Sequence, residues 1–206
     1  MHSFRSLIAG VLLLVATAAS AQTGTPDALV RNVTDEVLGI LAQAPESQAE
    51  RRQAAMRLIE DKIAPHFDFT RMTALAVGRG WRQADAGQRD ALTGEFRTLL
   101  VRTYANALGG YAGQKVSFKP SPATDAQGEA TVRSQIRQAG APPITVDYRL
   151  ARTDAEWKVF DVVVNNVSLV TNYRSSFATE MAQGGADGLI RALRDKNRQA
   201  AHPDKG

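Results

Sequence analysis

Apolar residues recur at steps of three and four between positions 88 and 111, and this spacing places them on one stripe of a long helix. Asp85 and Gln88 have the spacing of a capping box before the helix, and Gly109 with Gly110 ends it. The pattern leaves two possibilities open: an ordinary core helix, or a helix that lines a cavity for an apolar ligand. The stripe comprises Leu92, Phe96, Leu99, Leu100, Thr103, Ala107 and Tyr111, and it is widened by Tyr104 and Leu108.

Three shorter helices are predicted before the long one. The first begins near Thr25, the second near Ser47 and the third near Asp68 or Thr70, because each of these side chains can accept a hydrogen bond from the first backbone N–H groups of a helix. Their inward-facing apolar residues are Leu29, Val33, Val37, Ile40, Leu41, Met56, Leu58, Ile59, Ile63, Met72, Leu75, Ala76 and Val77.

After Gly113 the period of the apolar pattern changes from 3.6 to 2, which is typical of half-buried antiparallel strands. A fourth strand, at 157–164, is apolar on both faces. Asn165 and Asn166 then turn the chain into a helix that breaks at Gly184 and Gly185, and a last helix follows. The dry positions of the first three strands are Val116, Phe118, Ala130, Val132, Ser134, Ile136, Ile144, Val146, Tyr148 and Leu150.

This order of elements predicts an α+β fold. Four strands form a curved antiparallel sheet, and several helices cover it and enclose an apolar cavity. We expect the long helix and its neighbours to cover the dry face of the sheet.

The first 21 residues have the pattern of a secretory signal peptide: Arg5, an apolar run at 7–19, and small residues up to Ala21. We therefore expect a single domain at 22–198 and a flexible charged tail at 199–206. Cysteine is absent, so the exported chain has no disulfide and no cysteine for a lipoprotein anchor. The leader carries one of the 25 basic residues, which leaves 24 against 21 acidic ones, and this small excess does not indicate nucleic acid.

Few residues suggest catalysis. His66 and His202 are the histidines of the exported part, and no phosphate loop, nucleophile elbow or metal-ligand cluster occurs in the sequence, so we expect no metal and no cofactor. Asp147 lies on the wet face of its strand. Asp161 lies in the most apolar strand, where burial predicts either a raised pKa or an arginine partner.

Two blocks of sequence carry a resemblance to a known family. The first consists of residues 67–72, 80–82, 88–89, 96–105 and 113–116, and the second of residues 157–162, 167–170 and 172–177. Together they resemble the MlaC, or toluene-tolerance, family of periplasmic phospholipid-binding proteins. Asn165 and Asn166 depart from the family pattern before Val167, but asparagine tolerates a left-handed turn almost as well as glycine.

The resemblance implies a periplasmic carrier, soluble and not lipidated, rather than an enzyme. Such a carrier takes phospholipid between an outer-membrane lipoprotein complex and an inner-membrane ABC transporter of the MCE type, and so maintains outer-membrane lipid asymmetry. Its acyl chains enter a cavity between sheet and helices, and the headgroup stays near the mouth.

Site residues follow from the resemblance together with the apolar pattern. The candidates for contact with a headgroup or partner are Arg79, Arg82, Lys115 and Arg174. The candidates for the apolar pocket are Phe67, Phe69, Met72, Leu75, Val77, Trp81, Phe96, Leu99, Leu100, Tyr104, Leu108, Tyr111, Val146, Tyr148, Phe160, Val162, Val164, Leu169, Tyr173 and Phe177.

Two alternatives remain open. One is a carrier of the same family for a hopanoid or another lipid. The other is an isomerase or dehydratase of the nuclear-transport-factor-like cone fold, with Asp161 and His66 as the acid–base pair in an apolar pocket.

Overall fold

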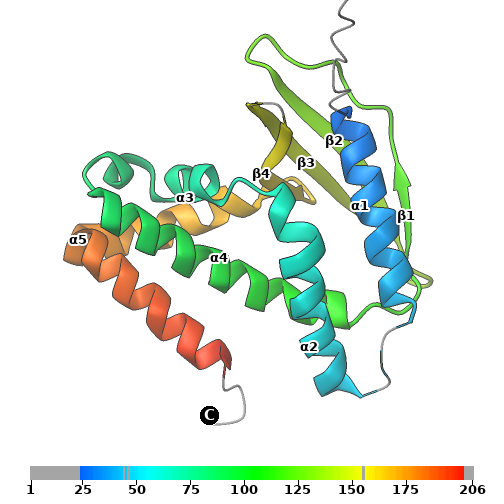
Figure 1. The fold of residues 1–206 in the computed structure, drawn as a ribbon, viewed down its shortest axis with the longest axis horizontal. Helices are drawn as coiled ribbons and strands as arrows, with labels where there is room; N and C mark the ends of the chain where they lie inside the picture. Colours follow the sequence, from blue (N-terminus) through cyan, green and yellow to red (C-terminus); the bar gives the residue numbers. More distant parts are fainter. Residues whose placement is uncertain (1–23, 44, 46, 155, 202–206) are drawn as a thin grey trace, which may run out of the picture.

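The structure is a computed structural model that describes residues 24–43, 45, 47–154 and 156–201 (Figure 1). The predicted signal peptide at 1–21 and the last part of the predicted tail lie outside the described residues. Residues 199–201 of that tail continue the final helix. None of the described helices combines the length and apolar character needed to cross a bilayer.

The chain begins with helices, continues with strands and ends with a helix. The elements are α1 (Pro26–Leu41), α2 (Gln48–Leu58), the π turn η1 (Ile59–Ile63), η2 (Ala64–His66), α3 (Phe69–Val77), η3 (Gly78–Arg82), α4 (Ala86–Gly109), β1 (Lys115–Phe118), β2 (Glu129–Arg137), β3 (Ile144–Thr153), β4 (Glu156–Val164), β5 (Val167–Ser168) and α5 (Leu169–Ala201). The predicted α+β fold class is confirmed.

The predicted helix starts are confirmed by hydrogen bonds from backbone N–H groups to capping side chains. Thr25 caps α1, Ser47 caps α2, and Asp68, rather than Thr70, caps α3 through the N–H of Arg71 at 2.8 Å. Asp85 and Gln88 form the complete capping box of α4, with bonds of 2.8 and 3.1 Å. The predicted break in the last helix is the kink of α5 at Gly185, where φ is +60°.

The sheet is an antiparallel meander in the order β1-β2-β3-β4-β5. It has five strands instead of four, because the two-residue β5 pairs with the end of β4 after the turn at Asn165 and Asn166. Both asparagines have positive φ, as expected for residues that stand in for glycine. The predicted alternation is also confirmed, since Val132 pairs with Tyr148 and Ala130 with Leu150 on the dry face.

The expectation that the long helix and its neighbours cover the dry face is correct only at the C-terminal end of α4, where Ala107 and Leu108 line the space over the sheet. That face packs against α1, where Val30 forms a core with Val132, Leu150 and Val159. In Figure 1, α1 lies against β1 and β2, whereas α4 runs through a separate layer of helices. α4 packs on α5, α3 and α2, because its apolar residues face neighbours on more than one side.

Candidate functional site

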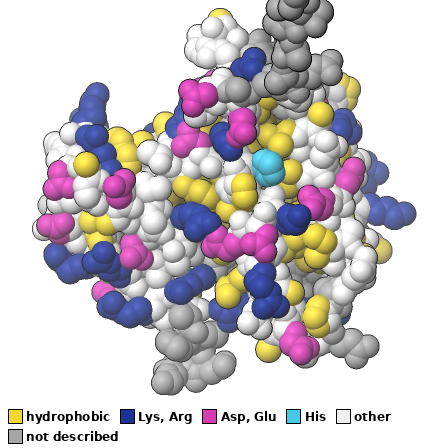
Figure 2. All heavy atoms as spheres, viewed as in Figure 1, with side chains coloured by type: hydrophobic (Ala, Val, Ile, Leu, Met, Phe, Trp, Pro, Cys, Tyr) yellow, Lys and Arg dark blue, Asp and Glu magenta, His cyan; other side chains and the backbone are white. Residues whose placement is uncertain are grey.

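A cavity of about 420 Å³ lies between α1 and the dry face of the sheet. The floor comes from the strands, one wall from α1, and the other from η1, η2 and the C-terminal end of α4. On the face shown in Figure 2, hydrophobic side chains reach the surface among charged ones in the region between α1 and α2. The lining residues are Leu29, Val30, Val33, Thr34, Val37, Leu38, Leu41, Ile63, His66, Phe67, Ala107, Leu108, Tyr111, Gln114, Val116, Ile136, Gln138, Ala141, Pro142, Ile144, Tyr148 and Val159.

Local structure explains why this region stays hollow. The helix that begins with α2 widens into a π turn at η1, an irregularity found often at functional sites, and Ile63 at its end lines the cavity. The helical run ends with η2, a 3-10 turn that contains Pro65, and Phe67 then forms a parallel bridge to Val159. The backbone N–H of Asp68 donates to the carbonyl of Val159 at 2.9 Å, so this segment is fixed to β4 at one end of the cavity.

The mouth of the cavity is at the turn between β2 and β3. Ala141, Pro142 and Ile144 line the cavity and are exposed to solvent, with 41% of Ile144 accessible. Beside them, the side-chain amide of Gln114 donates to the side-chain oxygen of Gln138 at 3.2 Å. The mouth is therefore polar at one edge and apolar elsewhere.

The cavity chemistry favours an apolar guest. None of the described lining residues is Lys, Arg, Asp or Glu. Burial lowers the pKa of His66, which favours its neutral form. Burial also raises the pKa of the Tyr148 hydroxyl, so that side chain stays neutral as well. Binding here rests on excluding water from apolar groups rather than on ion pairs.

Four of the predicted pocket residues line this cavity: Phe67, Leu108, Tyr111 and Tyr148. Another group lies in the layer of helices, where Phe96 contacts Tyr173 and Phe177 with ring centroids 5.0 and 5.1 Å apart. The predicted pocket residues that belong to this helical core are Phe69, Met72, Leu75, Val77, Trp81, Phe96, Leu99, Leu100, Leu169, Tyr173 and Phe177.

The remaining predicted pocket residues lie elsewhere. Val162 packs on the core between α1 and the sheet, and Val146 and Val164 face each other across β3 and β4. Phe160 is buried beneath the guanidinium group of Arg71, whose Cζ atom lies 3.7 Å from the ring centroid. Tyr104 is 39% exposed on α4.

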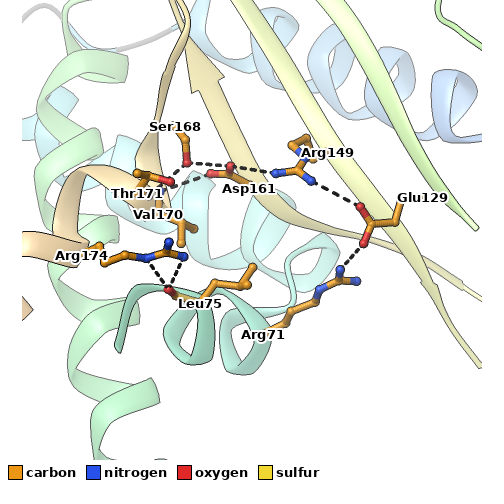
Figure 3. Close-up of polar contacts among 9 residues, drawn as sticks. All are labelled: Arg71, Leu75, Glu129, Arg149, Asp161, Ser168, Val170, Thr171 and Arg174. Atoms are coloured by element: carbon orange, nitrogen blue, oxygen red, sulfur yellow. Dashed lines mark hydrogen bonds and ion pairs between the residues drawn. The ribbon is translucent and has the colours of Figure 1, made fainter. Parts of the chain in front are cut away.

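The predicted headgroup contacts are also divided. Arg79 and Arg82 lie on η3, and Arg174 of α5 donates two hydrogen bonds to the carbonyl of Leu75 in α3, as Figure 3 shows. These three positions belong to the layer of helices and are absent from the cavity wall. Lys115 follows directly after Gln114, so its backbone lies next to the mouth.

The carboxylate of Asp161 is engaged in a network on the opposite side of the sheet (Figure 3). It accepts hydrogen bonds from the Ser168 hydroxyl at 2.7 Å and from the Val170 N–H at 3.2 Å, and it lies 3.8 Å from the Arg149 guanidinium. The predicted arginine partner is therefore present. Through Glu129 the network continues from Arg149 to Arg71, so it ties α3, the sheet and the start of α5 together.

The acid–base pair of the alternative enzyme is not brought together. His66 lines the cavity, whereas Asp161 is 2% exposed and is bonded to Ser168, Val170 and Arg149. No hydrogen bond or ion pair joins the two side chains within the part of the chain that the structure describes.

The main contribution that residue patterns did not assign to the pocket comes from α1. Its lining residues are Leu29, Val30, Val33, Thr34, Val37, Leu38 and Leu41. Their helical spacing was visible, and α1 is more sharply amphipathic than α4. A helix with one narrow apolar face can pack on a sheet and leave its other face in solvent. The stronger amphipathicity of α1 was therefore the feature of the sequence that could have placed α1, rather than α4, on the sheet.

The fold and the cavity define a class of small α+β binding proteins in which an apolar hollow lies between a helix and a curved sheet. Within it, this chain belongs to the MlaC protein family, whose model matches residues 31–195, so the resemblance is confirmed.

Two curated relatives support this. The toluene tolerance protein of Pseudomonas putida is 26% identical over 181 residues, covering 86% of this chain and 84% of its own length. The binding protein MlaC of the intermembrane phospholipid transport system of Haemophilus influenzae is 25% identical over 190 residues, covering 90% and 88%. A solved phospholipid-binding protein from Ralstonia solanacearum, in complex with a phospholipid, matches with a TM-score of 0.79 and 34% identity, covering 86% of this chain and 99% of its own.

Proposed function

We propose that this protein binds a phospholipid with acyl chains in the cavity between α1 and the sheet. The observation that carries the proposal is the cavity itself, which is about 420 Å³ in volume and has no charged lining residue among those described. Its size falls within the range of small-molecule sites. Family membership and the lipid complex of the Ralstonia relative support a phospholipid over other apolar guests.

Magnitudes explain why such a lipid needs a carrier. A two-chain lipid has roughly thirty methylenes, and at about 0.8 kcal/mol each their exposure to water costs on the order of 20 kcal/mol. The same chains are equally dry in a bilayer, so a protein cavity gains little over a membrane. The free energy of moving a lipid from a membrane to the carrier is then close to zero. Docking partners, with their energy input, set the direction of transfer.

We further propose the transport context. The protein is exported through a signal peptide at 1–21, works in the periplasm without a lipid anchor, and forms one lipid-binding domain at 22–198. It carries phospholipid between an outer-membrane lipoprotein complex and an inner-membrane ABC transporter of the MCE type, which maintains outer-membrane lipid asymmetry. The name of the Haemophilus relative supports this context.

The test compares two tryptophan substitutions on α1. Val33 is half-buried in the cavity wall, whereas Asn32 is exposed and absent from the wall. The protein is purified without detergent from cells, and its lipid is extracted and identified by mass spectrometry. We expect wild type and Asn32→Trp to carry phospholipid, and Val33→Trp, which fills the cavity, to carry several-fold less.

Each outcome is informative. A folded Val33→Trp variant with a full lipid load would place the lipid elsewhere. Hopanoid in place of phospholipid in the extract would favour the second carrier class. Wild-type protein that carries no lipid would refute the proposal.

A further inference from the structure

A second hollow adjoins the cavity at the opposite end of α1 from Pro26. This head groove, of about 330 Å³, lies between the C-terminal ends of α1 and α4 and one side of α2. Leu41, Leu108 and Tyr111 line both hollows, so the two spaces adjoin at these side chains. A molecule that leaves the cavity past them enters the head groove. The remaining residues of the groove are Ile40, Gln43, Pro45, Arg51, Ala54, Leu58 and Gly109.

Arg51 is the charged residue among the described residues that line the head groove. It is half-buried on α2, and its Nε donates to the carbonyl of Pro45 at 2.5 Å, which fixes the plane of the guanidinium. Neither of its Nη atoms has a hydrogen bond or an ion pair with any residue that the structure describes. Its neighbour Arg52 differs, because it donates to the carbonyl of Ala200 at 2.8 Å. Arg51 thus offers a fixed, positively charged donor pair beside an apolar space.

The two hollows together match the two ends of an amphiphile. The cavity presents apolar walls without a described charge, and the head groove presents one oriented guanidinium. A phosphodiester is an anion with two oxygens that accept hydrogen bonds from such a planar fork, and charge-assisted bonds of this kind are about twice as strong as neutral ones. Partial burial strengthens the attraction further, since water screens it less.

We propose that the phosphate of the bound phospholipid sits in the head groove against Arg51, with the acyl chains in the cavity. This assignment rests on the proposed function and extends it to the headgroup. It adds a residue outside the set predicted from the sequence, and it replaces Arg79, Arg82 and Arg174, which lie in the layer of helices, as the phosphate contact. Recognition is of the diester that phospholipids share, so different headgroups are accepted.

The test measures preference within one experiment. Delipidated protein is equilibrated with vesicles that contain equal amounts of phosphatidylglycerol and diacylglycerol with the same acyl chains, then separated, and its bound lipids are quantified. Wild type is expected to favour the phospholipid. Arg51→Gln is expected to lower the ratio of phospholipid to diacylglycerol about tenfold, as for one lost charge-assisted contact. Arg51→Lys, which keeps the charge but not the fork, should fall between them.

Two controls carry the same charge change at other sites. Arg57 is exposed on the same helix and absent from both hollows, and Lys115 lies beside the mouth. Arg57→Gln is expected to keep the wild-type ratio, and Lys115→Gln tests the competing headgroup candidate predicted from the sequence. An unchanged ratio in Arg51→Gln, or the tenfold loss in Lys115→Gln instead, would overturn the assignment. If Arg51→Gln does not fold, Arg51→Lys takes its place. In that case the assignment is overturned if folded Arg51→Lys keeps the wild-type ratio of phospholipid to diacylglycerol while Lys115→Gln lowers it.

A free phosphate ion is the other source of the same chemistry. Inorganic phosphate at millimolar concentration is therefore titrated into the delipidated protein by calorimetry. If phosphate binding requires Arg51 but the ratio of bound lipids does not depend on Arg51, the lipid assignment is overturned. If wild type takes up neither lipid from the vesicles, the proposed function itself fails, and this outcome is distinct from an altered ratio.

Discussion

The two halves of the molecule use similar apolar residues in opposite ways. In the layer of helices, Phe96, Tyr173 and Phe177 form edge-to-face and tilted pairs with centroids 5.0 to 5.5 Å apart, and Phe96 is fully buried. Between α1 and the sheet, comparable side chains enclose about 420 Å³ of space. Packing, rather than composition, therefore distinguishes a core from a binding cavity in this molecule.

The geometry of contact explains the difference. α4 has neighbours on several sides, so its residues interdigitate with those of α2, α3 and α5. α1 touches the sheet closely at Val30 and is held at its edges by polar contacts: Asp27 accepts from the Ser121 hydroxyl at 2.8 Å, and Glu36 pairs with Lys62 at 2.6 Å. A helix fixed in this way covers the sheet without filling the space beneath it.

The largest expected effect comes from one truncation made in each half. Leu92 is fully buried in the helical core, whereas Leu38 is half-buried in the wall of the cavity. Leu92→Ala should lower the free energy of unfolding by about 2–5 kcal/mol, because it leaves a void in a filled core. Leu38→Ala should cost about 1 kcal/mol or less, since its side chain already borders a hollow. Denaturant unfolding measures both, and equal costs would contradict the comparison.

The polar network around Asp161, which links the sheet to α3 and α5, should contribute less to the free energy of unfolding. Asp161→Ala removes the acceptor for Ser168 and for the N–H of Val170 at the start of α5, and we expect a loss of about 1–3 kcal/mol in the free energy of unfolding. Asp147 provides the matched control, because it lies on the exposed face 3.9 Å from Arg133. Asp147→Ala should cost no more than about 0.5 kcal/mol. If both substitutions lower the free energy of unfolding equally, the network of Figure 3 does not stabilise the contact between the two halves.

Features set by local sequence could be predicted, whereas features set by contacts between distant segments could not. Caps and strand alternation are local, so the caps at Asp68 and Asp85 and the dry-face positions of Val132 and Tyr148 were predictable from the sequence. Whether a helix meets a sheet or other helices depends on contacts between distant segments. The stripe around Phe96 was therefore compatible with a core as well as with a cavity.

The residues of α1 show the converse limit. Val33 and Val37 have the spacing of an ordinary buried helix face, and nothing local reveals that the space opposite them is empty. The polar pair at the cavity mouth could not be predicted from the sequence either. Gln114 precedes β1 and Gln138 follows β2, and the two side chains meet only in the folded sheet. Nothing in the sequence around Arg51 distinguishes it from the other charged residues of the chain.

The smallest expected effect is a pH dependence that belongs to the hollow half. The pKa of His66 is lowered chiefly by burial and also by Lys158, while Glu156 and Glu36 oppose the shift. The unfolded chain therefore binds the proton more readily than the folded one, so stability falls as pH falls from above about 6.5 through the folded-state pKa. Lipid in the cavity would bury His66 further, so lipid affinity should fall in the same window.

Thermal unfolding and lipid occupancy measured from about pH 7.5 to about pH 5 check this expectation, with His66→Gln as the variant that lacks the titration. Both profiles should be flatter in His66→Gln than in wild type. Profiles that fall equally in the two proteins would assign the pH dependence to other groups.

The most direct test of the central claim is a map of lipid contacts. Delipidated protein is loaded with a phospholipid that carries a photoactivatable group on an acyl chain, irradiated and digested, and the labelled peptides are identified by mass spectrometry. We predict labels on α1 and on the dry face of β2 and β3, with α3 and the first half of α5 unlabelled. Labels concentrated on α3 and α5 would place the lipid in the layer of helices and contradict the account.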